Sequence, residues 1–292
     1  MKNKKKRVRE ITDYIKFVFP MLVLYILFFI FPLFQTIGYS FTDYNGINPR
    51  KEFTGLTNYF DVFQDKWFYN SMAFTGKSVL LMILLANVLG FLLALALNTK
   101  IRSRNILRAI VFCPFVFNNV TVGFIWQFLL GRFMTDLYPL TGWKVFNIGW
   151  LSDSSLVLYS VVFVKLWQSI GYFMVIYLAG LQLLPQDPLE AAVIDGCTGI
   201  KMIRYITIPL MKPTAFVCIF LAITESLNMF PLIMSLTNGG PGHASENISL
   251  YIYNEAFKSH RMGYASALAV ILTIIMTIIA GLQMKLTRED AG

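Results

Sequence analysis

The stretch FVFPMLVLYILFFIFPLFQTIGYSFT, residues 17–42, decides the fold class of this 292-residue chain. It contains no charged residue over 26 positions, and about 20 apolar residues are enough for a helix to cross the hydrocarbon core of a bilayer. The basic start KNKKKRVR is typical of a secretory signal, but the apolar run exceeds a signal core and no small-x-small cleavage pattern closes it. We therefore interpret it as a retained first membrane span.

The composition of the whole chain points the same way. Hydrophobic residues make up 56% of it and charged residues 14%, whereas soluble domains carry about 25% charged residues. The net charge of +9 does not predict nucleic-acid binding, because seven of the 25 Lys and Arg residues lie within residues 1–16. The three cysteines, Cys113, Cys197 and Cys218, show no spacing typical of a disulfide framework or a zinc site.

Charge-poor intervals of sufficient length predict six transmembrane helices. We expect them within residues 17–40, 77–100, 108–132, 155–184, 214–236 and 261–285. They must be helical, because a lipid-exposed segment has to satisfy its own backbone hydrogen bonds. The predicted fold class is therefore an all-α integral membrane protein with six transmembrane helices.

Basic residues in the loops predict the orientation of the chain. The two ends, the 2–3 loop and the 4–5 loop hold 16 Lys and Arg residues, and the other three loops hold seven. The positive-inside bias then places both termini in the cytoplasm. We expect a basic segment at 1–16, one membrane domain at 17–284 and a cytoplasmic tail at 285–292. The 4–5 loop at 185–213 is long enough to suggest a function of its own.

Several functional motifs are incomplete in this sequence. TGKS at residues 75–78 resembles the end of a phosphate-binding loop, but Ser71 stands where that motif needs glycine. His243 and His260 lack partners at metal-ligand spacing, so we expect no metal site. No nucleophile-and-base pattern appears either, and the sequence does not predict an enzyme.

The 4–5 loop has local signals for two short helices. Asp187 is a suitable N-cap, Pro188 suits the first helical position, and Glu190 could complete a capping box. Gly196 and Gly199 can adopt the left-handed conformation that ends this first helix.

We expect a second helical stretch at 200–206, stopped by Pro209. The loop also contains more apolar residues than a free cytoplasmic segment should expose: Leu189, Val193, Ile194, Met202 and Ile203. They either pack under the chain's own helices or form a docking element for a soluble partner.

The segment EAAVIDGCTGIKMIRYITIP, residues 190–209, resembles the cytoplasmic EAA motif of permease subunits of binding-protein-dependent ABC importers. Matching positions are Glu190, Ala191, Ala192, Gly196, Ile206 and Pro209, with Ile208 in place of Leu and Cys197 in place of a small Ala. Further segments resemble the carbohydrate-uptake branch, closest to the maltose and glycerol-phosphate type first permease: SFTDYNG at 40–46, GLTNY at 55–59, LTNGGPG at 236–242 and YIYNEAF at 251–257.

This resemblance implies a type I importer permease in the bacterial cytoplasmic membrane. It would pair with a second homologous permease and an ATPase dimer, and an extracytoplasmic solute-binding protein would deliver a sugar substrate. The chain itself would hold no cofactor, since ATP and Mg are bound by the ATPase. The loop would be the coupling helix, with Glu190, Ala191, Ala192, Asp195, Gly196 and Pro209 in the ATPase-coupling role.

Polar residues inside two predicted spans suggest a substrate path. Lys165, Gln168, Ser169 and Tyr172 share one helix face, and Glu225, Ser226, Asn228 and Met229 form a patch on the next span. At similar depth, Lys165 and Glu225 could pair.

These residues either join helices by hydrogen bonds or bind a hydroxyl-rich ligand. Alignment to the maltose-type permease implies sugar contacts at Gln168, Ser169, Tyr172, Glu225, Ser226 and Met229, with Lys165 in the same path. One lysine is few cations for a phosphorylated substrate, which favours a neutral sugar over glycerol phosphate. A self-sufficient secondary carrier is a weaker alternative, because no inverted repeat or broken helix is visible in the sequence.

Overall fold

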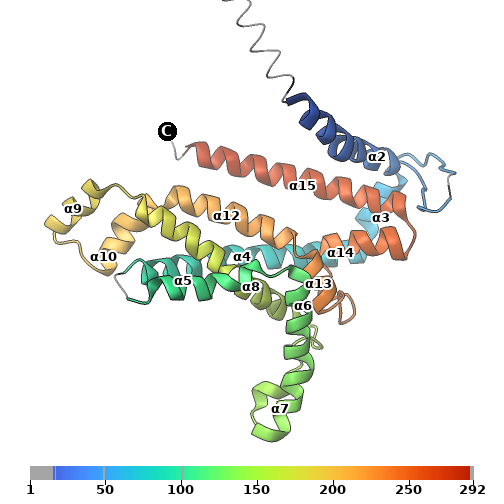
Figure 1. Ribbon diagram of the computed structural model, residues 1–292. Helices are drawn as coiled ribbons and strands as arrows, with labels where there is room; N and C mark the ends of the chain where they lie inside the picture. The colour runs from blue at the N-terminus through green and yellow to red at the C-terminus, as the bar shows by residue number, and fades with distance from the viewer. Residues whose placement is uncertain (1–15, 17, 49, 100–101, 290–292) are drawn as a thin grey trace, which may run out of the picture. The chain divides into compact units, whose positions relative to one another are not determined.

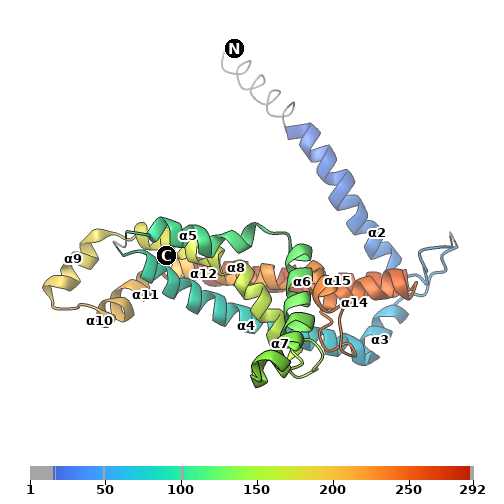
Figure 2. The ribbon, with the colours of Figure 1, turned by 60° about the horizontal axis from the view of Figure 1, so that its bottom comes forward.

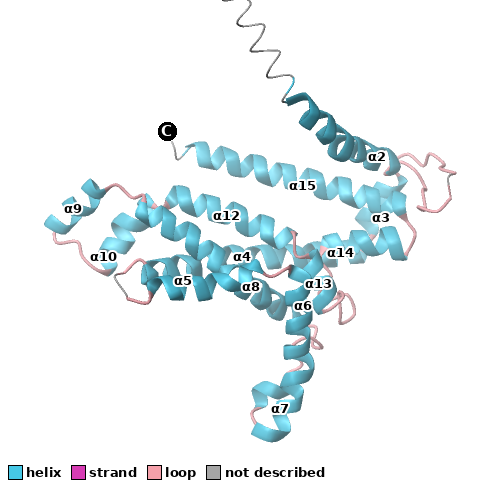
Figure 3. Cartoon of the chain, viewed as in Figure 1, coloured by secondary structure: helices cyan, strands magenta, loops and turns pink. Residues whose placement is uncertain are grey.

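The computed structural model describes residues 16, 18–48, 50–99 and 102–289, without the side chains of 286–289 (Figure 1). The described residues form helices joined by loops (Figure 3), and one isolated bridge joins Thr42 and Phe53. The predicted all-α membrane fold is confirmed. Except for Lys16, the predicted basic segment lies outside the described residues, as do residues 290–292.

Four helices are long and apolar enough to cross a membrane as single spans: Val18–Tyr39, Lys66–Leu97, Val157–Gln182 and Met262–Lys285. Two bent pairs bring the number to six if each pair is one span. In the first pair, Arg104–Val116 and Asn119–Thr141 meet at 94°, and in the second Ile200–Leu210 and Lys212–Leu227 meet at 71°. The second span begins at Lys66, well before the predicted start at Lys77.

The chain divides into two compact units. The first contains residues 1–65 and 252–274, including α2 (Phe31–Tyr39), α3 (Thr57–Gln64), η6 (Asn254–Lys258) and the start of α15 (Met262–Glu289). A π-helical stretch, η1 (Ile26–Ile30), precedes α2. Within this unit the backbone N–H of Gly263 donates to Tyr44 O at 2.7 Å, and the Tyr264 hydroxyl donates to the Asp65 carboxylate.

The second unit contains residues 66–251 and 275–292. Its centre is a set of three helices, α4 (Lys66–Leu97), α8 (Val157–Gln182) and α12 (Lys212–Leu227), each in contact with the other two. Against α8 pack α5 (Arg104–Phe112) and η2 (Cys113–Val116). The apolar core of the unit includes Met82, Phe173, Met174 and Leu232, all fully buried.

The two ends of the second unit are built from short elements. One end carries α9 (Gln186–Ile194), α10 (Ile200–Met202), η5 (Ile203–Thr207) and α11 (Ile208–Leu210). Toward the other end lie α6 (Asn119–Gln127), η3 (Phe128–Phe133), α7 (Met134–Thr141), η4 (Lys144–Asn147), α13 (Phe230–Leu236) and the start of α14 (Ile248–Tyr253) (Figure 2). The expected coupling loop and the 3–4 loop are therefore on opposite ends.

The third span is broken, which the sequence-based interpretation did not anticipate. Phe117 and Asn118 are extended, and they separate η2 from α6. The Asn118 side chain accepts a hydrogen bond from the Val120 backbone N–H at 2.8 Å, so Asn118 is the N-cap of the new helix. Pro114 lies in the turn before the break.

The fifth span is also interrupted, although we expected one helix over 214–236. It ends at Leu227, and α13 begins at Phe230 with Pro231 in its first turn. Proline has no backbone N–H and cannot continue the ladder of the preceding helix. The expectation that the chain contains no broken helices is therefore wrong.

The expected start of the coupling-loop helix is wrong by two residues. The N-cap of α9 is Pro185 rather than Asp187, and it makes no side-chain cap bond. Asp187 lies in the first turn, so the capping box with Glu190 is not formed. The expectation that Pro209 stops the second helical stretch is also wrong. That stretch continues through Pro209 to Leu210, and π-helical turns over Ile203–Thr207 precede the proline, a local adjustment that accommodates a missing donor.

Candidate substrate path and coupling loop

Two charged side chains inside the spans form the centre of the candidate substrate path. Lys165 lies on α8 and Glu225 on α12, with Nζ 2.6 Å from a carboxylate oxygen. The lysine side chain is 3% exposed and the glutamate side chain 25% exposed. Charges in a membrane domain are costly unless they are paired or hydrated. The expectation that these two residues can pair is confirmed.

The break in the third span lies directly against this ion pair. Lys165 Nζ donates to Asn119 Oδ1 at 3.4 Å, and Gln168 Nε2 donates to the Phe117 carbonyl at 2.9 Å. A helix end leaves carbonyl groups without helical partners, and a buried one needs another donor. Two predicted path residues on α8 therefore hold the bend of the third span.

Three other predicted path residues lie in the protein interior. The Ser169 hydroxyl donates to Lys165 O at 2.8 Å, and the Ser226 hydroxyl donates to Ala222 O at 2.6 Å. Met229 is 1% exposed. Each serine hydroxyl therefore donates its proton to a carbonyl one turn earlier in its own helix. All three residues are buried in this conformation.

Tyr172 differs from these residues because its ring is half-buried and stacked. Its centroid lies 4.5 Å from that of Phe115, with an interplanar angle of 2°. Among the seven predicted path residues, Tyr172 and Glu225 keep partly accessible side chains. They are the members best placed to meet a ligand.

Sequence reasoning missed the contribution of residues 117–119. The signal was present, because Asn118 follows Pro114 at a spacing typical of a helix stop and a new N-cap. Because this signal lies inside a long apolar interval, the interval was interpreted as one continuous helix. Asn119 is consequently an additional polar residue of the site.

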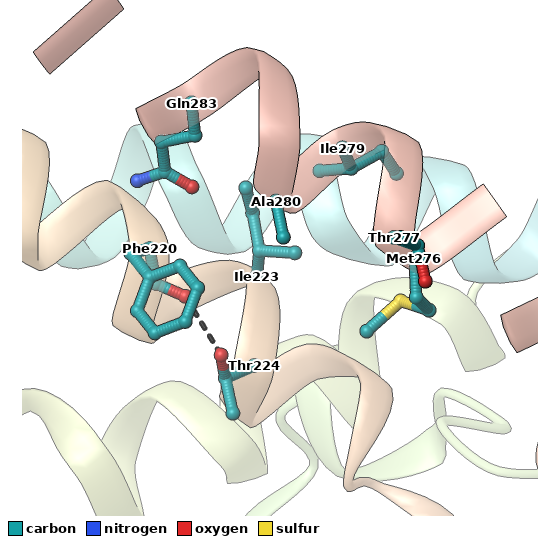
Figure 4. Close-up of a pocket in the computed structure, with 8 residues that line it drawn as sticks. All are labelled: Phe220, Ile223, Thr224, Met276, Thr277, Ile279, Ala280 and Gln283. Carbon is teal, nitrogen blue, oxygen red and sulfur yellow. Dashed lines mark hydrogen bonds between the residues drawn. The ribbon is translucent and has the colours of Figure 1, made fainter. Parts of the chain in front are cut away.

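A groove beside the fifth span has a different chemistry (Figure 4). It has a volume of about 280 Å³ and lies between Phe220, Ile223 and Thr224 of α12 and residues 276–283 of α15. The Thr224 hydroxyl donates to Phe220 O at 3.0 Å, so its proton is already used. The surface of this groove is mostly apolar, which does not fit a hydroxyl-rich ligand.

The expected coupling loop, residues 185–213, bends where glycine was expected to permit it. Gly196 has φ +76°, and Gly199 also has positive φ. The Cys197 N–H donates to Ala192 O at 2.8 Å, and the Gly196 N–H donates to Val193 O at 3.0 Å. These two bonds are the Schellman arrangement that satisfies carbonyls at a helix C-terminus. Of the predicted coupling residues, Ala192 is buried; the exposed ones are Glu190, Ala191, Asp195, Gly196 and Pro209.

Large apolar side chains of the loop are open to the surroundings. The exposed residues are Val193, Ile194, Ile200, Tyr205 and Ile208. Leu189, Met202 and Ile203, which were also predicted to need cover, are half-buried. The chain's own helices thus cover only part of the apolar surface of the loop, and exposed apolar clusters commonly mark interaction sites.

Comparison with known proteins gives a consistent set of relatives. Residues 86–288 match the family described as binding-protein-dependent transport system inner membrane component. The chain is 35% identical over 291 residues to the probable starch degradation products transport system permease protein AmyD of Thermoanaerobacterium thermosulfurigenes, covering 99% of this chain and 98% of AmyD. It is 34% identical to the multiple sugar-binding transport system permease protein MsmF of Streptococcus mutans, covering 94% of each.

A solved structure has the same fold. The match is to a chain in the crystal structure of a bacterial ABC transporter involved in the import of the acidic polysaccharide alginate. The TM-score is 0.82 over 99% of both chains, at 21% sequence identity.

The helical architecture and these matches define a multi-pass integral membrane permease. The chain belongs to the family of binding-protein-dependent transport system inner membrane components, and it is the permease subunit of an ABC importer. The EAA-motif resemblance is thereby confirmed at the level of the family. Members of this family are not catalytic and hold no cofactor, since ATP is handled by a partner ATPase.

Proposed function

We propose that this permease subunit forms half of the translocation path for a sugar or oligosaccharide. The observation that carries the proposal is the polar composition of the path, in which one buried cation is already neutralised by Glu225. The partly accessible groups of the path are the Glu225 carboxylate, which can bind sugar hydroxyls, and Tyr172, whose hydroxyl can do the same and whose ring offers an apolar face to the C–H surface of a sugar. The names of AmyD and MsmF, which refer to starch degradation products and multiple sugars, support the same substrate class.

The coupling loop would transmit conformational changes of the ATPase to the membrane-spanning helices of the permease. We infer that α9 and the following bend dock on a cytoplasmic ATPase dimer, with Glu190, Ala191, Ala192, Asp195, Gly196 and Pro209 at or near the contact. The exposed apolar residues of the loop support this role. A second homologous permease would complete the path, an extracytoplasmic binding protein would deliver the substrate, and both termini would lie in the cytoplasm.

The test is uptake by the reconstituted complex. The chain would be co-expressed with its second permease, ATPase and binding protein, placed in proteoliposomes and supplied with ATP on the ATPase side. A panel of neutral oligosaccharides, polyols and glycerol 3-phosphate would serve as substrates. We expect ATP-dependent uptake of at least one neutral sugar, and uptake of glycerol 3-phosphate alone would contradict the proposed substrate class.

Glycerol phosphate remains the alternative substrate because it belongs to the same branch of importers. A phosphate group favours Arg forks or several cations, and Lys165 is enclosed and paired. Within the described path the geometry favours a neutral ligand. A secondary carrier is distinguished by the same apparatus, because it would transport without ATP and without partner chains.

A further inference from the structure

A second cavity lies in the part of the second unit that contains α6 and α13. Its volume is about 310 Å³, within the range of roughly 300–1,000 Å³ typical of small-molecule sites. Side chains from three segments line it, among them Gln127, Thr135, Trp150, Ser152 and Thr237. None of the described residues that line this cavity is charged.

The tryptophan in this cavity is held in place by its neighbours. The indole Nε1 of Trp150 donates to Val145 O at 3.2 Å, and the Trp150 carbonyl accepts from the Ser160 hydroxyl at 2.7 Å. Its side chain is half-buried, so part of it remains accessible. A fixed indole provides a rigid apolar surface at small cost in conformational entropy.

The loop that carries Ser152 is also ordered by local hydrogen bonds. The Asp153 carboxylate accepts bonds from the hydroxyl and the backbone N–H of Ser155, at 2.7 and 2.8 Å, which lower the pKa of the Asp153 carboxyl from its ordinary value. This carboxylate caps the turn that leads into α8 and does not line the cavity. These bonds define the local conformation of the loop beside Ser152.

Two of the polar side chains are available to a ligand. The side chains of Gln127 and Ser152 are exposed and form no hydrogen bond among the described residues. The Thr135 hydroxyl donates to Gly131 O at 2.8 Å but retains lone pairs that can accept. An amide, hydroxyls and an indole without a charge fit a neutral, hydroxyl-rich molecule.

The cavity is connected to the ion pair by one helix. Asn119, which contacts Lys165, begins α6, and Gln127 ends it. At 1.5 Å per residue the two positions are about 12 Å apart along the helix axis. Because α13 packs along α6 and also ends at the cavity through Leu236, the same helix pair runs between the two polar sites.

We propose that this cavity is an entry subsite that binds one or two neutral sugar units before they reach the Lys165–Glu225 pair. It rests on the proposed sugar transport and adds a second binding position, at the end of the path that the loop charges predict to face outside. A chain-like substrate could occupy both positions, whereas a single sugar could occupy one.

Cysteine protection in the assembled complex tests the location. Ser152→Cys places a thiol in the cavity, and Ser154→Cys places a matched exposed thiol two residues away and outside the lining. Labelling by a membrane-impermeant maleimide would be followed with and without a transported oligosaccharide, with the unaltered chain as the background for Cys113. At a sugar concentration about ten times Kd, labelling at 152 should slow about tenfold, because only empty sites react, while labelling at 154 should not change. Thr135→Cys is a second reporter if Ser152→Cys prevents assembly.

Uptake kinetics test the role. Gln127→Leu should raise KM for oligosaccharides several-fold, because it removes an amide of the subsite, whereas the exposed control Gln64→Leu should leave KM unchanged. If a saturating transported sugar leaves the labelling rate at 152 unchanged, as at the control position 154, the subsite is overturned and the transport function stands. Protection by a neutral sugar without any uptake supports the subsite and contradicts the transport proposal. Protection by glycerol 3-phosphate alone overturns the proposed ligand class.

Discussion

Lys165 on α8 and Glu225 on α12 form an ion pair of 2.6 Å whose two ends are buried unequally. The ammonium is almost enclosed, while a quarter of the glutamate side chain is exposed. The lysine also reaches Asn119 at the break of the third span. The ion pair and its contact with Asn119 therefore join three spans: α8, the interrupted third span and the bent fifth span.

Removal of one partner of the Lys165–Glu225 pair should lower the stability of the complex more than removal of both. Glu225→Ala leaves the Lys165 ammonium buried without a counter-charge, and we expect a loss of about 3–5 kcal/mol in stability. Lys165→Ala combined with Glu225→Ala should recover most of this loss, because the interaction energy is not additive. The melting temperature of the purified complex would be measured for both single variants and for the double variant.

Transport in the same variants separates structure from substrate contact. If Glu225 binds sugar hydroxyls, the double variant should regain stability but not uptake, and any residual uptake should show altered sugar preference. Recovery of stability together with normal uptake would show that the pair is only structural.

Gln168 should matter for the bend of the third span. Gln168→Leu leaves the Phe117 carbonyl without its donor, which should cost about 1–3 kcal/mol. Ser169→Ala is the neighbouring control, because the Ser169 hydroxyl donates within its own helix. Its removal should lower stability by less than the about 0.5–1.5 kcal/mol that a typical hydrogen bond contributes. Thermal unfolding of the complex would compare them; equal losses in the two variants would contradict a specific role for Gln168.

The helical membrane fold was predictable because bilayer thickness imposes a long apolar interval on every span. Charge-poor stretches therefore located six regions near the observed spans. The interruptions were not predictable from hydropathy, because Phe117–Asn118 and Asn228–Met229 lie inside apolar intervals and interrupt the helices without adding charge. Pro231 and the Asn118 cap are local signals, but the Gln168 bond to the Phe117 carbonyl is a tertiary contact 51 residues along the chain that no local pattern reveals.

The candidate site was predictable in part for a similar reason. Polar residues at helical spacing inside a span must point toward other protein groups, so the Lys165 and Glu225 pairing could be inferred. Whether each residue faces ligand or protein depends on neighbours distant in the sequence. Asn119 lies 46 residues from Lys165 along the chain, and no local pattern links the two.

The contact between α6 and α13 should tolerate no side chain at Gly123. A Cβ added there would overlap the Ser235 hydroxyl and lie 3.0 Å from the Leu232 carbonyl oxygen. Gly123→Ala should therefore destabilise the complex by about 1–3 kcal/mol. Gly76→Ala, where a Cβ meets nothing within 4 Å, should be neutral or stabilising by up to about 1 kcal/mol. Partial rescue of Gly123→Ala by Ser235→Gly in thermal unfolding would identify the overlap as the cause, and a harmless Gly123→Ala would contradict the close packing.

The exposed apolar face of the coupling loop should be needed for assembly rather than for folding. Ile194 is 86% exposed at the end of α9, so Ile194→Asp removes few contacts within the chain. If the loop docks on the ATPase, this change buries an unpaired carboxylate in the contact, and both ATPase co-purification and uptake should fall strongly. Leu140→Asp on α7 changes a residue of similar exposure, 81%, away from the loop and should leave ATPase recruitment intact. The permease alone should melt at the same temperature in the unaltered chain and both variants. Undiminished recruitment of the ATPase by Ile194→Asp would mean that the apolar residue at the end of α9 is not part of the docking surface.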